Sequence, residues 1–188
     1  MGFWRSSRTA PARPPFSLPA VCGVSVTNVC NATCDFCAYA RDKKLIGTAR
    51  FVDSLAFAEA VPILRRRQIR HLTLQGGEPL LHPAIEALVE SAAKGGRQVA
   101  LITNGWRLPL KIGRLAEAGL SRLLVSLDSH SVTEHERNRG LPGVGSVSAK
   151  GWPVPSKRDW SPSPVSPSIV SCASRSCPRC SDALDSMR

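Results

Sequence analysis

The chain has 188 residues, the length of one ordinary domain, and a formal net charge of +11. Its only basic run, Arg65-Arg66-Arg67, lies at the end of a predicted helix, where the helix dipole favours positive charge, and no stretch interleaves basic with aromatic residues. We therefore expect no nucleic-acid binding. No apolar run is long enough to cross a membrane, and the Pro- and Arg-rich start lacks a signal peptide. We therefore expect a cytoplasmic protein with reduced thiols.

Residues 1–20 are rich in Pro, Arg and Ser and predict an extended N-terminal arm. Alternating strands and helices then predict a core domain over residues 21–144. The predicted strands are residues 21–27, 69–74, 98–103 and 120–127, and the predicted helices are residues 53–68, 83–94 and 108–118. We expect Asp53 to cap the first helix and Pro62 to kink or divide it. This alternation is typical of an α/β fold with a parallel sheet and right-handed crossovers.

Three cysteines follow directly after the first predicted strand. Cys30, Cys34 and Cys37 have the spacing C-x3-C-x2-C, which brings three thiols around one centre. Iron–sulfur clusters are held by cysteine thiolates at close spacings of this kind. A structural zinc ion usually takes four protein ligands, and no further Cys or H-x3-H pair occurs in the next hundred residues. Three is also an odd number for disulfides, so we favour a cluster with one open metal position over a zinc site or a disulfide.

Three further motifs lie where predicted strands end. They are Gly76-Gly77-Glu78-Pro79, Thr103-Asn104-Gly105 and Val125-Ser126-Leu127-Asp128. Because parallel strands place their carboxyl ends at one edge of the sheet, these motifs and the cysteine loop should meet there. Taken singly, each motif also fits an ordinary turn or a helix start, and Asp128 could simply cap the next helix.

The cysteine spacing, with the aromatic Phe36 before the third cysteine and the three motifs in this order, resembles the radical S-adenosylmethionine (SAM) superfamily over roughly residues 20 to 144. In motif style the chain is similar to the molybdenum-cofactor GTP-cyclising branch and the peptide-modifying, SPASM-type branch. The resemblance implies a partial parallel (β/α) barrel with about four of the family's six βα units.

The same resemblance implies the chemistry. A 4Fe–4S cluster would be ligated by Cys30, Cys34 and Cys37, and SAM would bind its open iron. An electron from the cluster would cleave SAM to a 5′-deoxyadenosyl radical, which abstracts hydrogen from an unknown substrate. An electron donor such as a flavodoxin or a ferredoxin is implied as a partner. The alternatives are a catalytically inactive cluster-binding remnant or a zinc-binding module.

The residues implied to contact SAM come from the motifs quoted above. Glu78 would hold the ammonium group of SAM, Gly76 and Gly77 would let the backbone approach closely, and Pro79 would stiffen the turn. Further candidates are Phe36 beside the cluster or the adenine, Thr103 in the pocket wall, and Ser126 and Asp128 at the carboxylate or ribose. Arg137 and Arg139 face either an anionic group or solvent, and His71 and His82 are expected to be structural.

The composition changes near residue 145. The last 48 residues contain 12 Ser and 7 Pro but only 8 Leu, Ile, Val or Phe residues, which predicts a disordered tail over residues 145–188. The next helix and strands of the family are not evident, so we expect a chain truncated or frame-shifted after about residue 144. The strand at 120–127 would then be an exposed apolar edge and the chain poorly soluble. Cys172, Cys177 and Cys180 resemble an auxiliary-cluster motif, but chance explains them better in a tract without a predicted strand.

Overall fold

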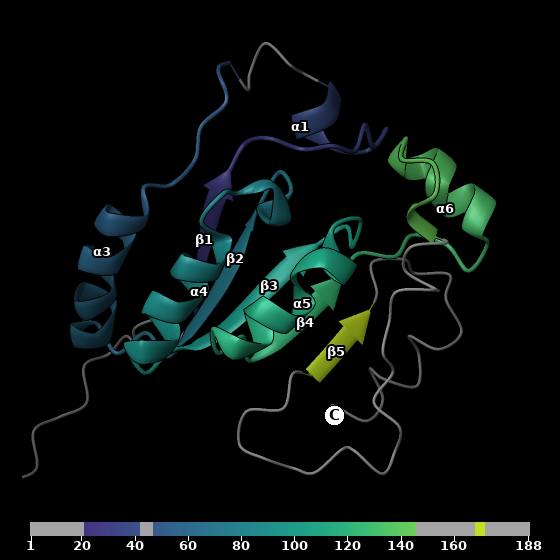
Figure 1. Cartoon of the computed structure of the whole chain (residues 1–188). Helices are drawn as coiled ribbons and strands as arrows, with labels where there is room; N and C mark the ends of the chain where they lie inside the picture. The colour runs from purple at the N-terminus through teal and green to yellow at the C-terminus, as the bar shows by residue number, and fades with distance from the viewer. Residues whose placement is uncertain (1–20, 42–46, 146–167, 172–188) are drawn as a thin grey trace, which may run out of the picture.

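One parallel sheet forms the centre of the molecule (Figure 1). The computed structural model describes residues 21–41, 47–145 and 168–171. Five strands lie side by side in chain order, so every crossover joins neighbouring strands. They are β1 (Val21–Thr27), β2 (His71–Gly76), β3 (Gln98–Thr103), β4 (Arg122–Val125) and β5 (Ser168–Ser171). The predicted α/β fold with a parallel sheet is confirmed.

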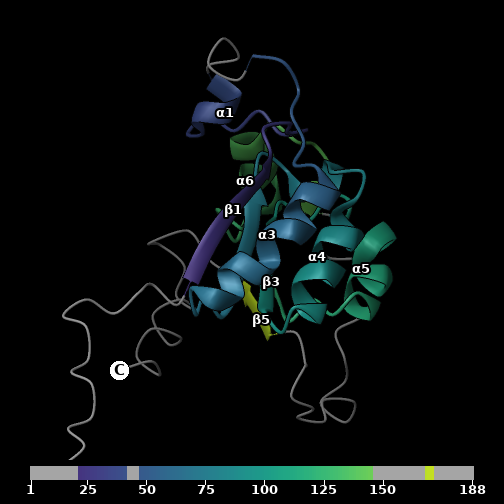
Figure 2. The same ribbon diagram turned by 90° about the vertical axis from the view of Figure 1, so that its left-hand side faces the viewer.

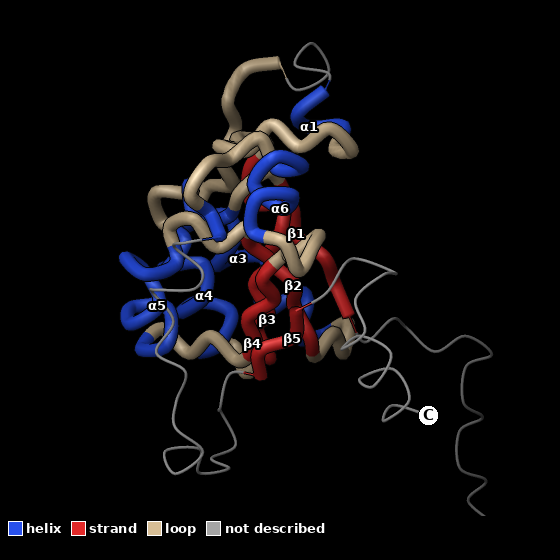
Figure 3. Tube along the Cα trace, turned by 90° about the vertical axis from the view of Figure 1, so that its right-hand side faces the viewer, coloured by secondary structure: helices blue, strands red, loops and turns tan. Residues whose placement is uncertain are grey.

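Three helices cover one face of this sheet, as two side views show (Figures 2 and 3). They are α3 (Ser54–Arg66), α4 (Ile85–Lys94) and α5 (Leu108–Glu117). Every second residue of the central strands is buried, for example Leu72 and Leu74 on β2 and Val99 and Leu101 on β3, while the residues between them are partly exposed. Side chains alternate between the faces of a strand, so this pattern follows from helices on one side only. Within the described ranges, none of the helices is long and apolar enough to cross a membrane.

The helix α3 begins as the sequence predicts. One carboxylate oxygen of Asp53 accepts hydrogen bonds from the backbone N–H groups of Leu55 (3.0 Å) and Ala56 (2.8 Å). Phe57 and Val61, four residues apart, are its buried side chains. Of the two outcomes expected at Pro62, division of the helix is wrong: Pro62 is exposed, and the helix continues to Arg66.

Another helix stands at the carboxyl ends of the strands, where the sequence predicts none. This helix, α6 (Val132–Arg139), has only two buried side chains, His135 and Arg139, so no apolar periodicity marks it. Its ends carry the signals instead. The Ser131 hydroxyl accepts a hydrogen bond from the backbone N–H of Glu134 (3.4 Å), and Gly140 ends the helix in the left-handed conformation with φ 53°.

The strand β5 corrects a second expectation. Residues 168–171 pair in parallel with β4, with Ile169 opposite Leu123 and Val170 opposite Leu124. The edge of β4 is therefore covered, and the reason given for poor solubility does not hold. Two β-branched residues suffice for a short strand, and averaging the composition over 48 residues hides them. The predicted arm (1–20), the rest of the predicted tail (146–167 and 172–188) and the tail cysteines lie outside the described residues.

Candidate functional site

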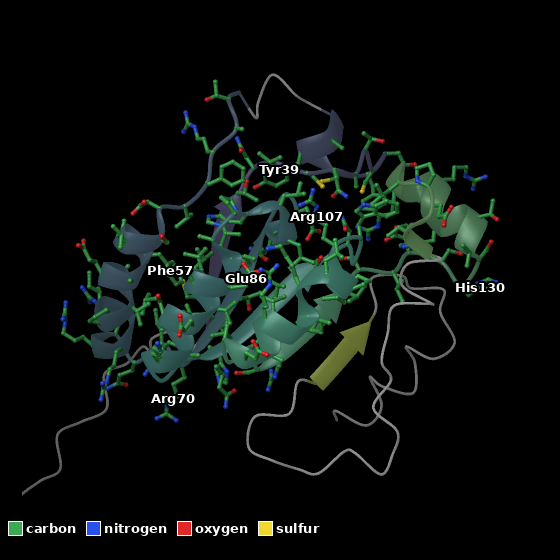
Figure 4. All side chains as sticks on the ribbon, in the orientation of Figure 1. Tyr39, Phe57, Arg70, Glu86, Arg107 and His130 are labelled. Carbon is green, nitrogen blue, oxygen red and sulfur yellow. The ribbon has the colours of Figure 1, made fainter. Side chains whose placement is uncertain are left out.

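The cysteine loop starts where β1 ends and is held there by hydrogen bonds. The Thr27 hydroxyl donates to the carbonyl of Arg50 (2.8 Å) and accepts from the N–H of Val29 (3.0 Å). The short helix α1 (Ala38–Arg41) follows directly after Cys37. Figures 1 and 4 show this loop above the carboxyl ends of the strands, between α1 and α6, with yellow sulfur atoms in the same region.

The three cysteines of the loop are free thiols in one packed environment. Cys34 is buried, at 6% exposed, and Cys30 and Cys37 are half-buried. They pack in a small cluster with Ala32, Trp106, Leu141 and Val144. Burial raises the pKa of the Cys30 and Cys34 thiols, and the nearby thiols of the loop raise it further, whereas the charge of Arg139 lowers that of Cys34. Metal binding at this site must therefore release protons from the thiols.

The Gly76-Gly77 pair lies against the backbone of the cysteine loop. The N–H of Gly77 donates to the carbonyl of Thr27 (2.8 Å), and the N–H of Glu78 donates to the carbonyl of Val29 (2.7 Å). Gly76 has φ 133°, and a Cβ on this residue would lie 2.3 Å from the carbonyl oxygen of Thr27. A Cβ on Gly77 would lie 2.2 Å from the carbonyl oxygen of Val29. The close approach expected of these glycines is thus an approach to the cysteine loop itself.

Glu78 is buried between the ends of β2 and β3. One carboxylate oxygen accepts hydrogen bonds from the N–H of Leu80 (2.9 Å) and the hydroxyl of Thr103 (2.6 Å), and the other accepts from the N–H of Asn104 (2.7 Å). Burial raises the pKa of Glu78, while these hydrogen bonds act in the opposite direction. Pro79 starts the short 3₁₀ helix η1 (Pro79–Leu81), which Glu78 caps.

Asn104 connects this carboxylate to the cysteine loop. Its side-chain amide donates to the side-chain oxygen of Asn31 (2.9 Å), and its own amide oxygen accepts from the N–H of Trp106 (3.0 Å). A continuous path of hydrogen bonds therefore runs from Glu78 through Asn104 to the segment between Cys30 and Cys34. The sequence predicts that this motif lies near the cysteine loop, but the hydrogen bonds through which Asn104 links the loop to Glu78 are visible only in the fold.

Asp128 lies at the end of β4 and binds α6. Its two oxygens accept hydrogen bonds from the Nε and Nη2 atoms of Arg139, both at 2.6 Å. It does not cap the helix, since Ser131 does. The N–H of Asp128 donates to Nδ1 of buried His135 (3.3 Å), and burial lowers the pKa of this histidine. Ser126 is half-buried, and its N–H donates to the Thr103 carbonyl (2.9 Å).

The remaining predicted residues are placed as follows. Phe36 is 58% exposed, and its ring centroid lies 5.4 Å from the guanidinium carbon of Arg139. Arg137 is exposed and Arg139 is buried. Buried His82 has both ring nitrogens within hydrogen-bonding distance of backbone atoms, the Val52 carbonyl (2.9 Å) and the Ala84 N–H (3.0 Å), which agrees with a structural role.

A family model described as the radical SAM superfamily matches residues 24–143. The chain belongs to the radical SAM superfamily. The matched range contains the cysteine loop, all three strand-end motifs and α6. The resemblance inferred from the motifs is thereby confirmed.

Curated relatives that the chain matches are named GTP 3′,8-cyclase, which fits the GTP-cyclising branch suggested by the motifs. The chain is 33% identical over 144 residues to a GTP 3′,8-cyclase of Geobacter sulfurreducens, covering 70% of this chain and 43% of the relative. It is 30% identical over 117 residues to a GTP 3′,8-cyclase of Aquifex aeolicus, covering 61% of this chain and 37% of the relative. The chain thus spans less than half the length of these radical SAM relatives.

Two solved structures share the fold. Streptococcus suis SuiB bound to S-adenosylmethionine matches with a TM-score of 0.61 at 16% identity, over 72% of this chain and 31% of SuiB. BtrN in complex with AdoMet and 2-DOIA matches with a TM-score of 0.52 at 20% identity, over 60% of this chain and 47% of BtrN. These likenesses confirm the predicted partial barrel.

The donor set of the loop suits the iron–sulfur cluster of this superfamily. Among the described residues, no three Cys, His, Asp or Glu side chains are grouped so as to hold a single metal ion. A cluster makes a different demand, because each thiolate binds a separate iron and the three sulfurs stand farther apart. Three free thiols on one loop, packed in one apolar cluster, supply the three cysteine ligands that such a cluster needs.

A pocket of about 290 Å³ adjoins the loop on the side of α1. Cys30 and Thr33 line it from the loop, and Tyr39, labelled in Figure 4, lines it from α1. Arg107, also labelled, lies toward this same end of the sheet, whereas Arg70 lies at the opposite end (Figure 4). The volume is near the lower limit for small-molecule sites.

Proposed function

We propose that the described core binds a 4Fe–4S cluster through Cys30, Cys34 and Cys37, binds SAM beside it, and forms the radical-generating part of a radical SAM enzyme. The observation that supports this most directly is the placement of three free thiols at the carboxyl end of β1, against the ends of β2 and β3. A bound and reduced cluster would supply the one electron needed to cleave a C–S bond of SAM, which would give methionine and a 5′-deoxyadenosyl radical.

The chain's own residues would position this chemistry and keep water away from it. The backbone of Gly76, Gly77 and Glu78 holds the cysteine loop in place. An ionised carboxylate has about four acceptor sites. Glu78 uses three of them internally, so one site on the oxygen that binds the Asn104 N–H remains for the ammonium group of SAM. Thr103, Ser126 and Phe36 remain proposed neighbours of SAM, with Pro79 fixing the turn that carries Glu78.

Asp128 takes a different place in the proposal from the one its motif predicts. Both of its oxygens are engaged by Arg139, so direct contact with the SAM ribose or carboxylate would have to compete with that ion pair.

The substrate is left open, because GTP is the substrate in the relatives' names and the chain covers less than half of each of them. An electron donor such as a flavodoxin or a ferredoxin belongs to the proposal, since the cluster must be reduced. A cytoplasmic location also stays a proposal.

The proposal is tested by anaerobic reconstitution with iron and sulfide. We expect a brown protein with about four irons per chain, and iron near background in Cys34→Ala, because two thiolates cannot hold three cysteine-bound irons. Cys22→Ala is the matched control, since Cys22 lies within β1 and outside the loop, and it should load like the parent. A colourless parent that binds zinc instead, or parent-level iron in Cys34→Ala, would contradict the assignment.

A further inference from the structure

The side chain of Arg139, in α6, makes three contacts, and two of them are with the cysteine loop. Its guanidinium group is held by both oxygens of Asp128. Its Nη1 atom lies 4.0 Å from the sulfur of Cys34, within hydrogen-bonding range for sulfur, and its guanidinium carbon lies over the ring of Phe36. Arg139 is only 8% exposed and Cys34 only 6% exposed, so water screens this charge weakly.

The backbone around Arg139 makes a second set of contacts with the same loop. The N–H of Thr33 donates to the carbonyl of Arg139 (2.9 Å), and the Thr33 hydroxyl donates to the carbonyl of Gly140 (3.3 Å). The N–H of Asp35 donates to the carbonyl of Asn138 (3.4 Å). The two residues that flank Cys34 are thus bound to the last turn of α6, more than a hundred positions away in the chain.

We propose that Arg139, oriented by Asp128, is a positioning residue that directs a buried positive charge and a hydrogen-bond donor at the Cys34 sulfur, and thereby raises the reduction potential of the cluster that the loop carries. Reduction adds negative charge to a cluster and its thiolates. A fixed cation and a hydrogen bond to one of those sulfurs stabilise the reduced state more than the oxidised state. The Asp128 carboxylate opposes this effect, but the charge of Arg139 acts on Cys34 more strongly than that of Asp128. Asp128 fixes the direction of the guanidinium group, because its two oxygens accept from two of the donors.

This inference rests on the proposed function, and a redox titration of the reconstituted 188-residue chain tests it. Arg139→Gln should shift the midpoint potential of the cluster to a more negative value than in the parent. Arg139→Lys keeps the charge without the two-point contact to Asp128, so it should recover part of the shift. Arg137→Gln is the control, because it removes the same charge from an exposed position two residues away, and it should match the parent.

The potential separates this role from that of an ordinary structural ion pair. Loss of a structural pair would lower the free energy of unfolding of Arg139→Gln without moving the potential. If Arg139→Gln takes up no cluster, the titration of Arg139→Lys decides the question. If the variant that is titrated has the same midpoint potential as the parent, the inference is overturned.

Hydrogen exchange in the iron-free chain gives a readout that needs no cluster. The Thr33 and Asp35 amides should exchange roughly tenfold faster in Arg139→Gln than in Arg137→Gln, because the loop opens locally when its anchor is lost. Equal protection in the two variants would overturn the positioning role even if the parent bound no iron. Failure of the parent to bind iron would instead contradict the proposed function, so the two failures are distinguishable.

Discussion

Glu78 is almost fully buried and receives three hydrogen bonds, one from Leu80 in η1 and two from Thr103 and Asn104 at the end of β3. The Gly-Gly-Glu-Pro motif predicts the carboxylate at the carboxyl end of a strand, and the structure places it there. What the motif could not predict is that Thr103 and Asn104, 25 and 26 residues later in the chain, donate to it. A contact of that separation depends on the pairing of β2 with β3 and not on any local pattern.

Replacing Glu78 should therefore affect stability as well as SAM binding. Glu78→Ala leaves three buried donors without acceptors, at a cost of at least about 2 kcal/mol in the free energy of unfolding. Urea unfolding of the iron-free chain measures it. Glu90→Ala is the control, because Glu90 forms only an exposed ion pair with Lys94, and its loss should cost less than about 0.5 kcal/mol. Equal stability of the two variants would contradict the structural role of Glu78.

At the level of the secondary-structure elements, apolar periodicity predicts the sheet and the helices on its face. The helices α4 and α5 appear within a few residues of their predicted ends, because their buried side chains repeat at helical spacing and Gly95-Gly96 and Gly119 follow them. Apolar periodicity does not predict α6, because this helix contacts loops at the carboxyl ends of the strands and does not pack on the sheet. Its signal was the Ser131-x-x-Glu134 capping pattern.

The junction of β2 with the cysteine loop depends on Gly77. A Cβ there would meet the Val29 carbonyl oxygen at 2.2 Å, so Gly77→Ala should lose roughly 1–3 kcal/mol of unfolding free energy. Gly113→Ala is the matched control, and it should change the free energy of unfolding in the opposite direction. Gly113 lies inside α5 with open space around it, and alanine there should gain up to about 1 kcal/mol. Thermal or urea unfolding compares the two; a Gly77→Ala chain as stable as Gly113→Ala would show that the loops do not approach in this way.

The helices α4 and α5 are joined by the ion pair of Glu86 and Lys111 (2.8 Å). Burial raises the pKa of Glu86, but the hydrogen bond and charge of Lys111, with help from Arg114, outweigh it and hold the pKa below its usual 4.5. The stabilisation is thus present above pH 4.5 and is lost as the pH falls through the lowered pKa. Lys111→Met should cost about 0.5–1 kcal/mol at pH 7 and nothing in strong acid.

Urea unfolding at the two pH values measures this difference, with Lys94→Met as the control. Lys94 pairs with Glu90 at a largely exposed position, so its loss should change little at either pH. A cost for Lys111→Met that persists unchanged in strong acid would show that packing, and not the ion pair, joins the two helices.

For the whole molecule, the sequence predicts which loops meet but not how they are held. Parallel strands in chain order bring the cysteine loop and the three motifs to one edge, and this followed from the alternation of elements alone. Some contacts between those loops involve Asn31 and Arg139, for which the sequence predicts no such contact, because these contacts depend on tertiary packing. The strand β5 was missed for a related reason: four residues within a Ser- and Pro-rich stretch become a strand only beside the ladder that β4 offers.

The central claim is that the three thiols carry a cluster with an iron that SAM can reach. Electron paramagnetic resonance of the reduced, reconstituted chain, recorded without and with SAM, tests it most directly. We expect the signal of a reduced 4Fe–4S cluster that changes shape when SAM is added, and no such signal in Cys34→Ala. A cluster signal that is unchanged by saturating SAM, or one that persists in Cys34→Ala, would contradict it.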